Sequence, residues 1–160
     1  MDLNSLIPSE STFTLAQFED TVFKLAPCTG GKMIEINKAL GSIEELLKQP
    51  DAINVSKLAM ALMTFESAKT FKKREVITID LEGTEKTTER GGYKLLADSI
   101  AGINEQWGIY SAILQSLGYT KEKAIETTES LKKAFEDAID EAMESPGVKK
   151  KKKKVTKQKK

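Results

Sequence analysis

The chain has 160 residues, a formal net charge of +1, 39% hydrophobic residues, no histidine and one cysteine. A chain of this length can bury about 68–70% of its unfolded surface, so it needs neither a disulfide nor a metal for stability. The absence of histidine excludes Ser-His-Asp triads, Cys-His dyads and histidine-ligated metals, and the single Cys28 excludes internal disulfides and thiolate clusters. We therefore expect a binding protein without a cofactor, not an enzyme.

The first 27 residues are predicted to contain little regular structure. Residues 1–21 are expected to form an irregular arm, since they contain a proline and several serines and threonines. Residues 22–27 have the composition of a short strand that ends at a proline.

Three helices are predicted next. Residues 32–40 carry apolar side chains at helical spacing. Ser42 and Glu45 form a capping-box pattern, in which each side chain satisfies a free backbone N–H at the start of a short helix. A longer helix is predicted over residues 55–70, where leucine, methionine and phenylalanine recur on adjoining turns.

Residues 76–82 change to a period of two. Ile77, Ile79 and Leu81 point to one side of the predicted strand and polar residues to the other, which is typical of a half-buried strand. Gly83 then turns the chain, and residues 84–88 are expected either to return as a polar second strand or to remain a loop.

The strongest helical pattern covers residues 92–117. Its large apolar residues recur in steps of four and three and make one continuous stripe. Tryptophan and tyrosine often dominate protein interfaces, so the stripe is the candidate partner-binding surface; the alternative is that it fills the domain's own core. The candidate residues are Leu96, Ile100, Ile103, Trp107, Tyr110 and Leu114. A last helix is predicted over residues 121–144.

The charge distribution separates a body from a tail. Nine of the 25 basic residues lie within residues 149–160, which leaves 16 basic against 24 acidic residues in the preceding 148 and a net charge there of −8. Like charges repel and the tail has only Val155 to bury, so residues 146–160 are predicted to be disordered. The expected fold is mainly α with a small β-hairpin or short strands (α+β). It comprises a compact helical domain over residues 22–145 and the basic tail.

Two motifs partly resemble ligand-binding sites, but we interpret both as ordinary structure. Residues 27–32 partly match a phosphate-binding loop, but that loop needs a glycine where Ala26 stands and a serine or threonine where Met33 stands. We expect a plain strand-to-helix turn there. Glu136, Asp140 and Glu144 share one helix face, but they lack the spacing of a calcium loop, so a solvated face is expected and no metal.

The lysine run Lys149, Lys150, Lys151, Lys152, Lys153 and Lys154 has three interpretations. It can contact nucleic-acid phosphates, with an affinity that falls steeply with salt. It can act only to solubilise the chain. The third interpretation concerns the message, because six lysine codons in succession require a nearly pure adenine tract, on which ribosomes slip by one nucleotide.

Taken together, the chain resembles the tail assembly chaperones of long-tailed (siphovirus-like) bacteriophages. The likeness lies in the short strand that ends at Pro27, the helical region over residues 33–47, the small acidic helical body, and the lysine run at a slippage site. The strand at residues 77–81 has no counterpart in that pattern.

The resemblance implies a function in virion assembly. Such chaperones bind the long, aggregation-prone tape measure protein and keep it soluble during tail tube assembly. They occur as a short form and a longer form extended by programmed ribosomal frameshifting, and they are absent from the mature virion. The implied partners are the tape measure protein, the tail tube protein and the longer form of the chain itself, with self-association left open.

The sequence leaves two alternatives open. The chain could be a small phage nucleic-acid-binding protein, although its acidic body argues against nucleic acid as a partner. It could also be a structural protein that completes the tail or head. No stretch approaches the roughly 20 apolar residues that span a bilayer, so no membrane partner is expected. One unpaired cysteine and no apparent signal sequence indicate the host cytoplasm.

Overall fold

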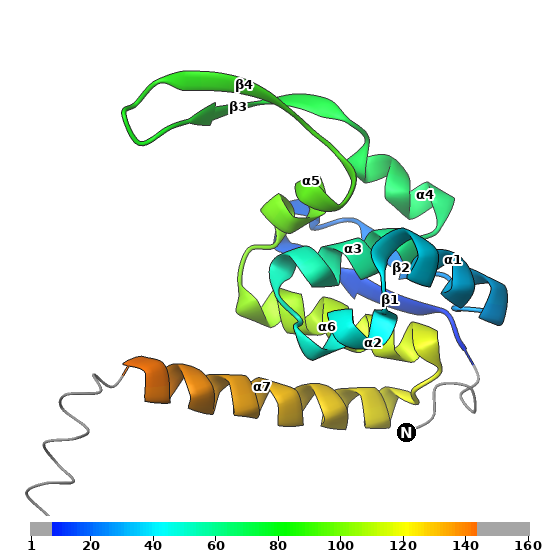
Figure 1. Ribbon diagram of the computed structural model, residues 1–160. Coiled ribbons are helices and arrows are strands. Elements are labelled where there is room, and N and C mark those ends of the chain that lie inside the picture. Colours follow the sequence, from blue (N-terminus) through cyan, green and yellow to red (C-terminus); the bar gives the residue numbers. More distant parts are fainter. Residues whose placement is uncertain (1–7, 144–160) are drawn as a thin grey trace, which may run out of the picture. The chain divides into compact units, whose positions relative to one another are not determined.

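The computed structural model describes residues 8–143 (Figure 1). Within these residues it contains seven α-helices, two 3-10 turns and two antiparallel two-stranded sheets, so the predicted α+β class is confirmed. The chain divides into two compact units, residues 1–125 and residues 126–160. The first unit takes in residues 8–21, which were expected to form an arm outside the helical domain. The predicted tail over residues 146–160 lies outside the described residues.

The expected irregular arm over residues 1–21 is wrong for its second half. Residues Ser11–Thr14 form strand β1, and Ala16–Phe18 form a 3-10 turn. Strand β1 pairs antiparallel with β2, Val22–Leu25, in a register that places Ser11 opposite Leu25. The sequence does not show the alternation of buried and exposed residues in β1, because a polar residue, Ser11, occupies a buried position. Its hydroxyl donates a hydrogen bond to the Ala112 carbonyl at 2.6 Å.

Four phenylalanines anchor this sheet to the body. The ring of Phe23 lies 5.3 Å from the rings of both Phe13 and Phe71, and the ring of Phe18 meets Phe23 and Phe71 edge-on at 5.8 and 5.9 Å. Such aromatic pairs stabilise a core beyond the area that they bury. Phe71 comes from the segment just before the second sheet, so the cluster joins residues far apart in sequence.

The two predicted N-terminal helices are present. Helix α1, Gly30–Leu40, begins two residues earlier than predicted, because the Thr29 side chain caps it by accepting a hydrogen bond from the Lys32 N–H. Helix α2, Ile43–Lys48, begins after Ser42, whose hydroxyl accepts from the Glu45 N–H as the capping-box pattern predicts.

The helix predicted over residues 55–70 is broken. Helix α3, Ala52–Leu62, ends where Met63 becomes extended and bridges to Leu25. Helix α4, Phe65–Ala68, then begins at a new cap, where the Thr64 hydroxyl accepts from the Ser67 N–H, and it runs into a 3-10 turn, Lys69–Phe71. Because of the break, the segment between α3 and α4 forms backbone hydrogen bonds with β2 and the residue after it: the Thr64 N–H donates to the Lys24 carbonyl, and the Ala26 N–H donates to the Leu62 carbonyl.

The helix predicted over residues 92–117 is also broken, into α5, Gly92–Ser99, and α6, Ile103–Leu117. Gly102 is fully extended, with φ −178° and ψ 177°. The Glu105 carboxylate stabilises the new helix start by accepting hydrogen bonds from the Ala101 N–H, at 2.7 Å, and from the Ala16 N–H, at 2.5 Å. Glu105 therefore also fixes the N-terminal segment to α6.

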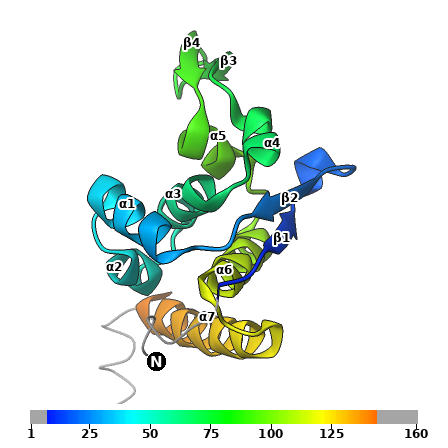
Figure 2. The same ribbon diagram turned by 90° about the vertical axis from the view of Figure 1, so that its right-hand side faces the viewer.

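Helix α6 is the centre of the first unit and packs against β1, β2 and α3 (Figure 2). The side chains of Ile109 and Ile113 are completely buried. The Ser116 hydroxyl donates to the Ala26 carbonyl at 2.6 Å, and the Ser116 carbonyl accepts from the Cys28 N–H at 3.0 Å. Gly118 ends the helix in the left-handed conformation, with φ 118°, as its position predicts.

Strands β3, Arg74–Ile79, and β4, Glu85–Arg90, form a hairpin that extends from the body beyond α4 and α5 (Figure 1). Of the two possibilities left open for residues 84–88, the second strand is confirmed. Helix α7, Lys121–Met143, confirms the last predicted helix and continues from the first unit into the second.

Candidate functional site

The predicted partner-binding stripe is mostly core. Leu96, Trp107, Tyr110 and Leu114 are buried and Ile100 is half-buried, and among the six residues only Ile103 is exposed. The break between α5 and α6 interrupts the stripe, and other elements of the first unit surround α6. The interpretation as a binding surface is therefore wrong for the four buried residues, and the alternative of a domain core is confirmed for them.

The segment over residues 27–32 is the plain strand-to-helix turn that the sequence predicted. Thr29 and the Lys32 N–H are used to cap α1, and the Lys32 ammonium lies 3.8 Å from the Glu35 carboxylate. Cys28 is buried, and burial raises the pKa of its thiol while the nearby Lys32 lowers it less. A buried thiol of this kind is a small packing residue, not a nucleophile.

The acidic and basic clusters of the sequence lie partly or wholly outside the described residues. Among residues 8–143 no group of histidine, cysteine or acidic side chains could hold a metal ion. Glu136 and Asp140 lie exposed on α7, whereas Glu144 lies outside the described residues. The lysines Lys149 to Lys154 also lie outside them, so their three interpretations stay predictions.

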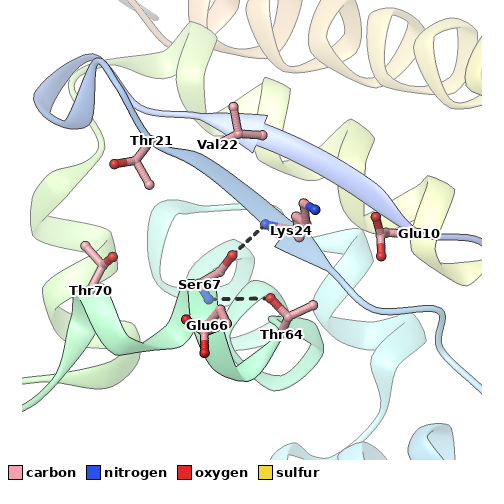
Figure 3. Close-up of a pocket in the computed structure, with 8 residues that line it drawn as sticks. All are labelled: Glu10, Thr21, Val22, Lys24, Thr64, Glu66, Ser67 and Thr70. Atoms are coloured by element: carbon pink, nitrogen blue, oxygen red, sulfur yellow. Dashed lines mark hydrogen bonds between the residues drawn. The ribbon is translucent and has the colours of Figure 1, made fainter.

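A shallow hollow of about 440 Å³ lies between β2 and α4 (Figure 3). Its polar groups already serve the fold: the Lys24 N–H donates to the Ser67 hydroxyl at 2.9 Å, and the Ser67 N–H donates to the Thr64 hydroxyl at 3.4 Å. Glu10 and Glu66 complete a mixed lining without a nucleophile and base in contact. The polar groups of the hollow therefore belong to the capped start of α4.

The hairpin carries the most exposed large apolar residues that the structure describes outside helices. Ile77 and Ile79 are 67% and 70% exposed, and Leu81 at the turn is fully exposed. The prediction of a half-buried strand is wrong, because β3 is mostly exposed and, within residues 8–143, pairs with β4 alone. The polar composition of residues 84–90 was the sequence signal for this, since such a strand has nothing to bury.

Helix α7 carries a second apolar surface, which we call the α7 seam. Its residues recur in steps of four and three, the spacing of helices that pack against other helices. The seam consists of Ala124, Thr128, Leu131, Phe135, Ala138 and Ala142, with Ile139 beside it. In the second unit, Phe135 is 37% and Ile139 46% exposed. Ala124 and Thr128 are buried and Leu131 is half-buried, so the exposed part of the seam is its C-terminal end, residues 135–142.

No helix within residues 8–143 combines the length and apolar character needed to cross a bilayer. No known protein family, curated protein or solved structure matches the chain. The function must therefore be argued from these surfaces.

Proposed function

We propose that this chain is a phage tail assembly chaperone that binds the tape measure protein and keeps it soluble while the tail tube assembles. The observation that carries the proposal is the α7 seam, an apolar surface with the spacing of a helix-packing face that is partly exposed. The second support is the lysine run Lys149 to Lys154, which we interpret as the product of a slippage site in the message.

The geometry of the seam fits a long helical client. The exposed part of the seam, residues 135–142, spans about 12 Å, which is roughly two turns of contact with another helix. The small side chains of Ala138 and Ala142 allow a close approach, and Phe135 supplies a large apolar group between them and Leu131. An exposed surface of this kind is covered best by a helix that carries the same repeat.

The remaining charge explains how such a complex stays in solution. Residues 1–148 have a net charge of −8, although the nine basic residues after them bring the whole chain to +1. Repulsion between these acidic bodies opposes close association of further complexes with each other. In this proposal the short chain and a rarer form extended by frameshifting both act in the host cytoplasm and leave before the virion is complete.

The test is co-expression with the tape measure protein of the same genome. Wild-type chain is expected to raise the soluble fraction of the client and to co-purify with it. The double substitution Phe135→Ser and Ile139→Ser is expected to reduce co-purification at least tenfold, because a polar seam gains little from burial against a helix. The matched control, Lys133→Ser and Asp137→Ser on the opposite face of α7, is expected to retain it.

Three results would contradict the proposal. The first is equal client binding by the seam variant and its control. The second is a stoichiometric amount of the chain in purified virions, which would favour the tail- or head-completion alternative. The third is salt-sensitive DNA or RNA binding that disappears when residues 149–160 are deleted, together with no client binding, which would favour the nucleic-acid alternative.

A further inference from the structure

We propose that hairpin β3–β4 joins copies of this chain, with the acidic face of one hairpin stacked on the basic face of the next. This inference uses a different surface from the α7 seam and does not depend on the proposed function.

The two faces of the hairpin carry opposite charges. In a strand, alternate residues share a face, and residues directly opposite across an antiparallel pair lie on the same face. The register places Arg74 opposite Arg90, Glu75 opposite Glu89, and Ile79 opposite Glu85. One face, which we call the acidic face, therefore consists of Glu75, Ile77, Ile79, Glu85, Thr87 and Glu89. The other, the basic face, consists of Arg74, Val76, Thr78, Lys86, Thr88 and Arg90.

This arrangement is unfavourable for an isolated hairpin. Like charges directly opposite each other destabilise a strand pair, and two such pairs occur next to each other, Arg74 with Arg90 and Glu75 with Glu89. Exposed ion pairs relieve this only partly: Lys73 lies 3.8 Å from Glu89, and Arg90 lies 3.4 Å from Asp98. If acidic and basic residues occupied other positions along the two strands, opposite charges could lie directly across from each other within the hairpin.

In the part of the chain that the structure describes, no element covers the two isoleucines of the acidic face. A two-stranded hairpin alone is only marginally stable in water, and Ile77 and Ile79 remain mostly exposed on the acidic face. A cover for that face must bring apolar groups at the centre and positive charges around them. The basic face has this composition, with Val76 and the threonine methyl groups beside Arg74, Lys86 and Arg90.

Charge complementarity therefore selects a second copy of this chain as the occupant. Stacking the two unlike faces sets three carboxylates against three cations and buries the isoleucines. Joining the hairpins edge to edge with like faces aligned would instead bring glutamates beside glutamates. Because the two contacting surfaces differ, the interface is heterologous, and each copy keeps one free face with which to continue a ring or an open chain.

The test uses two charge-reversed variants of the full chain. The acidic-face variant carries Glu75→Lys and Glu85→Lys, and the basic-face variant carries Arg74→Glu and Lys86→Glu. Neither weakens the hairpin by creating a like-charge pair, because each places opposite charges across from Glu89 or Arg90. In the first variant both faces are positive, and in the second both are negative, so neither can stack on itself.

Sedimentation equilibrium at about 0.1 mM suits the weak binding expected of so small an interface. Wild-type chain is expected to show an average mass well above the monomer mass of 17.7 kDa, and this mass is expected to fall as salt rises. Each variant alone is expected to be a monomer. An equimolar mixture of the two is expected to recover the wild-type mass, because the acidic-face variant then offers positive faces to the negative faces of its partner.

A matched control carries the same change in net charge as the acidic-face variant at sites away from the hairpin, Glu19→Lys and Glu126→Lys. It is expected to associate like the wild-type chain. A wild-type chain that is monomeric at 0.1 mM would overturn the proposal. So would variants that associate as the wild-type chain does, or monomeric variants whose mixture stays monomeric.

Discussion

The hydroxyl of Tyr110 donates a hydrogen bond to the backbone carbonyl of Leu47 at 3.2 Å. This bond joins the central helix α6 to the last turn of α2, where carbonyl groups lack partners within the helix. The ring of Tyr110 also meets the ring of Trp107 edge-on at 5.7 Å. One residue therefore satisfies a helix end and fills the core.

The stability of the chain is expected to fall with pH above about 10 through this residue. Burial, with a smaller contribution from Tyr119, raises the pKa of Tyr110 to about 12, whereas an unfolded tyrosine titrates near 10. Between these values the unfolded chain releases a proton that the folded chain keeps, so unfolding becomes easier by up to ~2–3 kcal/mol at pH 12. Below about pH 9 both states keep the proton and the contribution does not change.

Urea unfolding followed by circular dichroism from pH 8 to pH 11.5 measures this effect. Tyr110→Phe is expected to lower the free energy of unfolding by ~0.5–1.5 kcal/mol at pH 8, since the variant loses the hydrogen bond. Above pH 10 the stability of this variant is expected to depend less on pH than that of the wild-type chain. Equal pH dependence of the two proteins would show that Tyr110 does not contribute.

The hydroxyls of two buried serines are expected to differ in their contribution to stability. Ser116→Ala is expected to cost ~1–3 kcal/mol, because the Ala26 carbonyl loses a hydrogen bond of 2.6 Å in the core. Ser56→Ala is expected to be neutral or stabilising, because its hydroxyl is buried without a hydrogen-bond partner in the structure. The single Trp107 is buried, so its fluorescence reports unfolding of both variants; a larger cost at Ser56 than at Ser116 would contradict this account.

Gly91 is expected to tolerate no side chain. A Cβ atom added there would lie 2.7 Å from the Cα of Lys73, at the point where the two hairpin strands leave the body. Gly91→Ala is therefore expected to lower the melting temperature by several degrees. At the control position Gly31, which lies in α1, an added Cβ meets no atom within 4 Å, and alanine is favoured over glycine in a helix. Gly31→Ala is therefore expected to raise the melting temperature slightly.

Removing the hairpin is expected to leave the body folded. The strands β3 and β4 contact each other far more than any other element, and the aromatic cluster around Phe23 and Phe71 lies outside them. A chain in which a short Gly-Ser loop replaces residues 75–89 should therefore keep the near-ultraviolet circular dichroism of Trp107 and a cooperative melting transition. Loss of that signal would show that the hairpin stabilises the body.

The sequence predicted where helices and strands lie better than it predicted which faces are exposed. The spacing of Leu96, Trp107 and Leu114 predicted helix correctly, but it could not reveal that Gly102 is extended. That conformation depends on the bonds that Glu105 makes to Ala101 and to Ala16, the latter 89 residues away. Periodicity reports the preference of a segment, whereas a break depends on partners from elsewhere in the fold.

The candidate surfaces show the same limit. The alternation at Ile77 and Ile79 predicted a strand correctly and its burial wrongly, because burial depends on whether another layer covers the face. The opposite charges of the two hairpin faces follow from a register that pairs Glu75 with Glu89, and residues 84–88 left that register undetermined. The sequence predicted α7 as a helix, but it did not predict that Phe135 and Ile139 are partly exposed on it.

The hydrogen bond from Ser11 to Ala112 spans 101 residues, and it has a consequence for synthesis. At about 5–20 residues per second, a ribosome needs roughly 5–20 s to make the helix on which the first strand rests. Until then Phe13 and Phe23 have no finished core to enter. A chain proposed to protect another polypeptide from aggregation is thus itself exposed, for the greater part of its own translation, to the same hazard.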